Sequence, residues 1–223
     1  MKKQFLAILL SMVLAITFAF AIDPSGAVVT DGSEYGPISG PSAGTTDVTA
    51  GKIKEANLET NQSTVRWAGL TGNVSGNIQL GDGASSDVMY TWTAKGNIVY
   101  VSEQATPTWA SLTGATTSDI ESSYSHLAGS TADNVTETFN GATATDIGSN
   151  IFADFSVGAA RATTVAGWIT YALTDTSDII FAGIVDDKAN FRGDTADYEM
   201  IVPENGLDGD STATTYNIWV ELI

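Results

Sequence analysis

Short apolar segments, each bounded by turn residues, limit this chain to a fold made of strands. They recur from residue 74 to the last residue, and each is closed by Gly, Asp, Asn or Pro. β-Branched and aromatic residues favour strands, and polar turns between short strands favour antiparallel pairing. The segments are NVSGNIQL, DVMYTWT, NIVYVSE, VAGWITYAL, DIIFAGIVD, DYEMIVP and YNIWVELI. We therefore predict an all-β fold, an antiparallel β-sandwich of the jelly-roll type.

Two segments carry more specific strand predictions. DVTAGKIKEANLE, residues 47–59, places Val48, Ile53 and Leu58 among polar residues and is expected to form a strand. In residues 74–80, apolar residues and glycine alternate with polar residues, so this strand is expected to turn one face inward. The inward positions are Val74, Gly76, Ile78 and Leu80.

One segment has the period of a helix instead. In SDIESSYSHLAG, residues 118–129, apolar side chains recur at helical spacing. Ser118 and Glu121 have the spacing of a capping box, and Gly129 stands where a helix C-cap would. We predict one short helix that crosses an end of the sandwich.

Residues 1–21 have the order of a secretory signal peptide. Two lysines precede an uncharged apolar run from Phe5 to Phe20, and small residues surround the expected cleavage point after Ala21. This order predicts a secreted, extracellular protein. Two alternatives stay open, namely an uncleaved anchor helix and a pilin-type leader cut near Gln4.

The chain after the signal peptide divides into two parts. Residues 22–51 are rich in Gly, Pro, Ser and Thr, so we expect a segment without a core of its own. Its one apolar patch, GAVVTDG at residues 26–32, is expected to pair as a single strand with another element. Residues 52–223 are expected to form the β-sandwich domain.

The chain is strongly acidic and lacks cysteine. Its formal net charge is −17, and removal of the signal peptide, which holds two lysines and no acidic residue, makes it two units more negative. A basic face is required for phosphate contacts, so nucleic acid is excluded as a partner. An anionic membrane surface is disfavoured on the same ground. Without disulfides, stability must come from the core, from bound ions or from neighbouring subunits.

Three patterns could carry catalysis, and each has a simpler explanation. GPSAG, Gly40–Gly44, matches the Gly-x-Ser-x-Gly pattern but lacks the strand and helix that a nucleophile elbow needs. His126 is the only histidine and is expected at the end of a surface helix. The acidic pairs are expected to close turns, and they comprise Asp186, Asp187, Asp194, Asp197 and Glu199. We expect no enzyme, with a β-sandwich hydrolase as the weakest alternative.

Two kinds of modification or ion site are predicted. Asp208 and Asp210 offer hard oxygen ligands on a Gly-containing loop, which suits calcium, although the loop lacks the spacing of an EF-hand. Asn61, Asn73 and Asn134 each begin an Asn-x-Ser/Thr acceptor for N-glycosylation. Calcium and glycans are therefore the candidate bound or attached groups.

The tryptophans offer a test for a binding surface. Trp168 and Trp219 lie in alternating apolar segments and are expected in the core. Trp109, in ATPTWASLTG, has the least apolar surroundings and is the candidate for an exposed aromatic contact.

Three stretches resemble a group of secreted archaeal β-rich proteins of poorly defined function. They are AGKIKEANLETNQSTVRWAGLTGNVSGNIQLGD, ADNVTETF and the ending MIVPENG to TYNIWVEL. The resemblance implies a cell-surface protein, a subunit of a filament, sheath or surface layer. By analogy with fibre-forming proteins of jelly-roll fold, Ala27, Val28 and Val29 would form a strand donated to the next subunit.

The predicted function is therefore that of a self-assembling structural protein of the cell surface, with a homo-oligomer or polymer as its form. The alternative is an adhesion module that binds carbohydrate or another surface ligand through clustered aromatic side chains.

Overall fold

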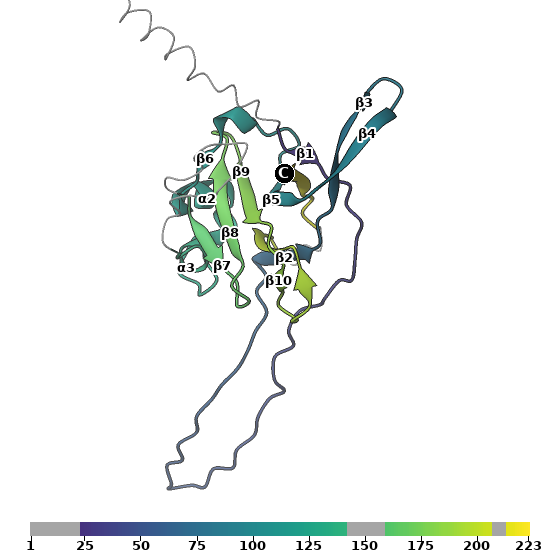
Figure 1. The fold of residues 1–223 in the computed structure, drawn as a ribbon. Helices are drawn as coiled ribbons and strands as arrows, with labels where there is room; N and C mark the ends of the chain where they lie inside the picture. Colours follow the sequence, from purple (N-terminus) through teal and green to yellow (C-terminus); the bar gives the residue numbers. More distant parts are fainter. Residues whose placement is uncertain (1–22, 142–158, 207–212) are drawn as a thin grey trace, which may run out of the picture.

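The computed structural model describes residues 23–141, 159–206 and 213–223, and it is dominated by one antiparallel sheet (Figure 1). The sheet has seven strands in the order β1-β13-β5-β9-β8-β6, and β7 also pairs with β8. These strands are β1 Ser25–Gly26, β5 Gly96–Ser102, β6 Thr113–Gly114, β7 Arg161–Thr163, β8 Ile169–Thr174, β9 Ile179–Ile184 and β13 Asn217–Leu222. The prediction of an antiparallel all-β fold is confirmed, while the jelly-roll arrangement in particular stays a prediction.

Three two-stranded sheets accompany the main sheet. They pair β2 Trp67–Gly72 with β12 Tyr198–Pro203, β3 Gly76–Asp82 with β4 Asp87–Ala94, and β10 Lys188–Ala189 with β11 Thr195–Ala196. The β2–β12 pair packs on one face of the main sheet, because Trp67, Met200 and Val202 share a core cluster with Val99 and Phe181. The architecture is therefore sandwich-like, with layers of unequal size.

The central strands are buried on both faces. Along β5, Val99 and Val101 enter the cluster beneath β2 and β12, whereas Ile98 and Tyr100 enter a second cluster on the opposite face. Trp168 is also buried, as predicted. Burial on both faces explains why NIVYVSE and DIIFAGIVD read as nearly continuous apolar runs rather than as strict alternation.

The helical region differs from the prediction in two respects. A helix α2 does form at Thr117–Ser123, but its N-cap is Thr116 and its capping box joins Thr116 to Asp119 rather than Ser118 to Glu121. The Asp119 carboxylate accepts from the Thr116 N–H at 2.7 Å. A second helix, α3 at Val135–Thr138, was not expected. Short 3-10 turns lie at Trp109–Ser111 and Ser125–Leu127. In the described part of the chain, no helix is long and apolar enough to cross a membrane.

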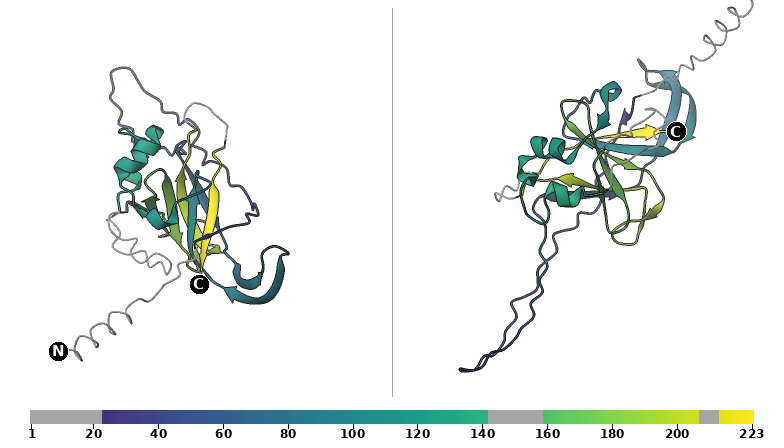
Figure 2. Two further views of the ribbon diagram at one scale, coloured as in Figure 1. Left: turned by 90° about the horizontal axis from the view of Figure 1, so that it is seen from above. Right: turned by 90° about the vertical axis from the view of Figure 1, so that its left-hand side faces the viewer.

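The prediction that residues 74–80 turn one face inward is wrong for most of that stretch. Val74 packs against the core, but Ile78 and Leu80 are exposed on β3. Strands β3 and β4 form a hairpin that projects from the body of the protein (Figures 1 and 2). Alternation shows that a strand has an apolar face, but it does not show that another layer covers that face.

Residues 28–63, here named the arm, contain no strand in the structure. The strand expected at residues 47–59 is absent, and Val48, Ile53 and Leu58 are exposed. Their spacing of five is odd, so successive apolar side chains would point to opposite faces of a strand and share no buried face. The part without a core thus continues to about residue 66 rather than ending at 51.

Candidate functional site

The N-terminal residues add to the open edge of the main sheet within their own chain. Ser25 pairs with Val220 and Gly26 with Trp219, and the Ala27 N–H donates to the Ile218 carbonyl at 2.9 Å. Of the predicted donor residues, only Ala27 takes part, because Val28 and Val29 are exposed beyond the pairing. The β13 edge therefore accepts an antiparallel strand, and the one it holds here is only two residues long.

The arm that follows is an elongated loop with two legs (Figure 1). The legs lie side by side, since the Ser63 hydroxyl donates to the Ile38 carbonyl at 3.0 Å. A turn closed by the Lys52 N–H and the Thr49 carbonyl, 3.1 Å apart, reverses the chain. The pattern GPSAG lies in this exposed loop without flanking strand or helix, so the context for a nucleophile elbow is missing.

Contacts near its ends hold the arm to the body. Near its start, the Tyr35 ring lies edge-on to Phe191 with centroids 5.5 Å apart, and the Arg192 guanidinium lies 4.5 Å from the Tyr35 centroid. These contacts join the arm to the turn between β10 and β11. An aromatic pair with a cation on its face is worth about 1 kcal/mol at an exposed site.

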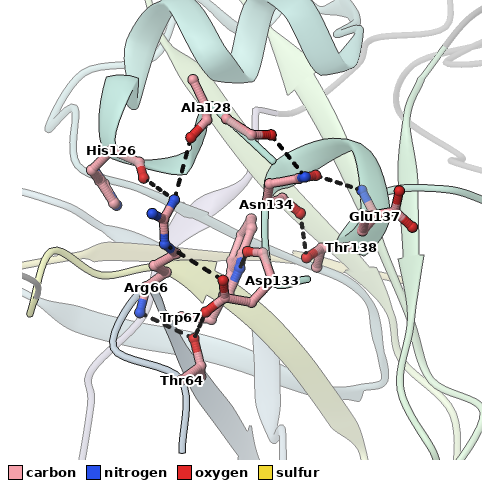
Figure 3. A network of polar contacts seen from close by, with 10 residues as sticks. Thr64, Arg66, Trp67, His126, Ala128, Asp133, Asn134, Glu137 and Thr138 are labelled. Atoms are coloured by element: carbon pink, nitrogen blue, oxygen red, sulfur yellow. Dashed lines mark hydrogen bonds and ion pairs between the residues drawn. The ribbon is translucent and has the colours of Figure 1, made fainter. Parts of the chain in front are cut away.

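A network of polar contacts anchors the chain where the arm ends (Figure 3). The Arg66 guanidinium pairs with the Asp133 carboxylate, Nε to Oδ1 3.5 Å, and also donates to the His126 carbonyl. The Thr64 hydroxyl donates to Asp133 Oδ2 at 2.8 Å, and Trp67 Nε1 donates to the Asp133 carbonyl at 2.6 Å. Burial alone would raise the pKa of Asp133, but hydrogen bonds from Thr64 and Thr131, the residue's own backbone N–H and the Arg66 charge together lower it. The network fixes the entry into β2 from the arm.

His126 sits beside this network, and its buried Nε2 has no hydrogen-bond partner among the described residues. Burial first, and the Arg66 guanidinium second, lower the pKa of His126 from its ordinary value of 6.5. The folded state therefore binds a proton more weakly than the unfolded chain does. The resulting stability is complete above pH 6.5 and is lost as the pH falls below that value.

This shift predicts a pH effect that His126→Gln removes. We expect the free energy of unfolding of the chain prepared without residues 1–21 to fall between pH 7 and pH 5, because the unfolded state gains the proton more readily. Since His126 is the only histidine, the variant should show a much flatter pH dependence in this window. Urea titrations followed by tryptophan fluorescence at both pH values check this. An unchanged slope in the variant would assign the effect to another group.

Two half-buried tyrosines near His126 are structural. Burial raises the pKa of Tyr124 and of Tyr216 far above the ordinary value of 10.0, so both phenols stay neutral at pH 7. The Tyr216 hydroxyl donates to the Pro203 carbonyl at 2.7 Å. A neutral phenol committed to a backbone carbonyl is no acid–base catalyst at physiological pH.

The prediction that the acidic residues close turns fits Asp186, Asp187 and Asp194, which lie between strands, but it is wrong for Glu199, which is buried in β12. Asp197 Oδ2 accepts from the Val74 N–H at 2.7 Å, and Glu199 Oε2 accepts from the Phe191 N–H at 2.6 Å. Asp194 pairs with Arg192 at 3.5 Å. Asp187 is exposed and donates its N–H to the Asp186 carboxylate. Across residues 23–141, 159–206 and 213–223, no three His, Asp or Glu side chains gather as a metal-ligand set.

The predicted calcium and glycan sites fall into three groups: outside the described residues, exposed, and buried. Asp208 and Asp210 lie outside the described residues, so a calcium site there stays a prediction. Asn61 and Asn73 are exposed. Asn134 is buried: its amide donates to the Gly129 carbonyl at 2.9 Å and its Oδ1 accepts from the Glu137 N–H at 2.8 Å. Because this side chain caps α3, a glycan on Asn134 is incompatible with the folded structure, and this acceptor prediction is corrected.

The prediction that Trp109 is exposed is wrong. Its side chain is 9 % exposed and lies 5.3 Å from the Tyr100 ring and 5.4 Å from the Trp219 ring, centroid to centroid. The sequence analysis missed an exposed aromatic pair, Tyr90 and Trp92 of β4, whose ring centroids lie 4.6 Å apart. Their spacing of two placed them on one face of a strand, which is the signal that could have identified a pair of neighbouring aromatics.

The described residues therefore offer a sheet edge covered only by the short strand β1, an exposed arm and an exposed aromatic pair. Comparison with known proteins found no matching family model, no similar curated protein and no similar solved structure.

Proposed function

We propose that the chain is a secreted structural protein of the cell surface that assembles with copies of itself into a filament, sheath or surface layer. The observation that carries the proposal is the β13 edge, which takes residues 25–27 as an added antiparallel strand. Strand addition to a sheet edge is a general mode of association. The signal peptide and the resemblance to archaeal surface proteins support the location.

Exchange of this strand between copies would form the same hydrogen bonds that it makes within one chain. The pairing is short, with Ser25 and Gly26 exposed, so little is lost when it opens. An extended arm can span on the order of 100 Å, which exceeds the roughly 30 Å of a small domain. The arm is therefore long enough to carry β1 to the edge of a neighbour, as in domain swapping.

The test compares the mature chain with a version that begins at Val28. We expect the mature chain to form oligomers that grow with concentration, and the shortened chain to assemble only at higher concentration, because it has no strand to donate. Size-exclusion chromatography with light scattering and negative-stain microscopy measure this.

A point variant provides the matched control. Ala27→Pro removes the N–H that donates to Ile218 in both the closed and the exchanged pairing, so β1 should open more easily and exchange between labelled copies about fivefold faster, the effect of one backbone hydrogen bond. Thr30→Pro, placed in the exposed arm, should leave this exchange unchanged. If the mature chain and the version that begins at Val28 are identical monomers, the proposed function is wrong.

A second candidate function is an adhesion module for carbohydrate. The specific observation in its favour is the pair Tyr90 and Trp92, whose exposed rings lie together on one face of β4. Exposed aromatic side chains commonly mark a contact surface. A change in tryptophan fluorescence on addition of soluble oligosaccharides would favour this function over self-assembly.

A further inference from the structure

The hairpin formed by β3 and β4 has one polar face and one apolar face. Ile78 pairs with Trp92 and Leu80 with Tyr90, so these four side chains share a face, here named the hairpin face. Each of the four is between 43 and 56 % exposed. The opposite face carries Asn77, Gln79, Thr91 and Thr93, and Met89, 84 % exposed, follows on this face at the irregularity near the end of the hairpin. An apolar face of this kind on a soluble protein marks a site of contact.

The body of the protein supports only the base of this hairpin. At the base, Gly76 lies so close to Leu222 that an added Cβ would stand 2.6 Å from its Cδ2, and Ala94 is buried. Beyond the base, the two strands project alone (Figure 2). A two-stranded ribbon is at best marginally stable in water. A further element that covers the hairpin face would stabilise it.

The turn of the arm has the complementary chemistry. Ile53 is fully exposed between Lys52 and Lys54. Among the described residues, neither lysine forms an ion pair, and the Lys54 ammonium donates only to the Asp47 carbonyl at 3.2 Å. Residues 76–94 contain no Lys or Arg, and Asp82 faces Asp87 at the end of the hairpin. In so acidic a chain, two lysines around an exposed isoleucine suit an apolar face that ends in two carboxylates.

The arm and the hairpin lie on opposite sides of the body. In each view the arm extends away in one direction while β3 and β4 project in another (Figures 1 and 2). The turn of the arm therefore lies far from the hairpin of its own chain. Two different surfaces on opposite sides of one molecule join copies head to tail, and such a contact builds a ring where the rotation closes and an open polymer where it does not.

We infer that residues 51–55 of one copy dock on the hairpin face of a second copy. Ile53 packs against Trp92 and Leu80, and Lys52 and Lys54 lie near Asp82 and Asp87 of the neighbour. The inference rests on the proposed function, since it names a second contact that joins the copies. It is distinct from the exchange of β1, which uses the β13 edge.

Cysteine pairs test this contact directly, because the chain has no cysteine of its own. The test variant carries Ile53→Cys and Leu80→Cys. The control carries Ile53→Cys and Gln79→Cys, which places the second thiol on the polar face, one residue away. Under mild oxidation by dissolved oxygen, we expect a ladder of covalent dimers, trimers and larger species from the test pair, and at least about tenfold less from the control. Links between two Ile53→Cys positions give dimers only and occur equally in both.

A charge variant provides the second measurement. Leu80→Asp should raise the concentration needed for assembly about tenfold, the effect of losing a central interface side chain. Thr91→Asp, on the polar face of the same hairpin, should leave it unchanged. Circular dichroism confirms that both variants fold.

The outcomes separate this inference from the proposed function. Equal ladders from both cysteine pairs, links within one chain only, or assembly that ignores Leu80→Asp would overturn this inference alone. A fluorescence response of Trp92 to a soluble oligosaccharide without intermolecular links would overturn it in favour of a glycan. A wild-type chain that stays monomeric at every concentration would overturn both proposals together.

Discussion

Phe181→Ala is expected to lower the free energy of unfolding by about 3–5 kcal/mol. Phe181 is completely buried in β9, which lies between β5 and β8 in the main sheet. Its ring lies 6.2 Å from that of Tyr124 and 6.0 Å from that of Phe139, centroid to centroid. It therefore joins the main sheet to the helical layer, and truncation leaves a cavity that rigid strands on both sides cannot fill.

Urea titration followed by tryptophan fluorescence measures this loss. Phe191→Ala is the matched control: its side chain is 55 % exposed, so only the contact with Tyr35 is lost, worth about 1 kcal/mol. A loss at Phe181 no larger than that at Phe191 would contradict the packing of the helices on the sheet.

Asp175→Ala is expected to cost about 2–4 kcal/mol at pH 7. Asp175 is buried in the turn between β8 and β9, and its carboxylate accepts from the N–H groups of Thr108, Ser177 and Asp178 at 2.9–3.1 Å. The next residue, Thr176, has a φ of 80°, which a β-branched residue rarely adopts. The carboxylate thus holds together a strained turn and a neighbouring loop.

The same carboxylate gives a pH dependence of known sign. Burial on its own would raise the pKa of Asp175, but the three N–H donors outweigh it and lower the pKa below 3.8. The stability it provides is therefore present above about pH 4 and is lost as the pH falls through the folded-state pKa.

Unfolding measured from pH 7 down to pH 3 should show wild type and Asp175→Ala converging at the acid end. Asp187→Ala removes an exposed carboxylate and should change stability by less than about 0.5 kcal/mol. Curves for wild type and Asp175→Ala that stay parallel to pH 3 would refute the assigned role.

Most strands of the main sheet could be predicted from the sequence, because their composition favours a strand and the surrounding layers then bury that strand. The segments NIVYVSE, VAGWITYAL, DIIFAGIVD and YNIWVELI overlap β5, β8, β9 and β13 and include all but one terminal residue of β5 and of β8. Each is rich in β-branched and aromatic residues and ends at a turn residue, and the surrounding layers then bury them. Local preference and tertiary packing favour the same state.

The candidate sites could not be predicted in the same way. Trp109 has polar neighbours in the chain, yet it packs against Tyr100 and Trp219, which come from distant strands. Asn134 has the acceptor motif, yet its side chain is committed to the cap of α3. In both residues the deciding contacts are long-range or depend on a helix that the sequence did not predict.

By itself, the sequence determined that the chain forms antiparallel strands, that it carries a strongly acidic surface without disulfides, and that its N-terminal part lacks a core. The tertiary structure alone decided which apolar faces are covered. Both β3, with its period of two, and β5, with its nearly continuous apolar run, predict a strand with a buried face, but β5 lies between two layers whereas β3 and β4 project beyond them. Side-chain alternation is a local property of a strand, and burial depends on elements that are distant in sequence.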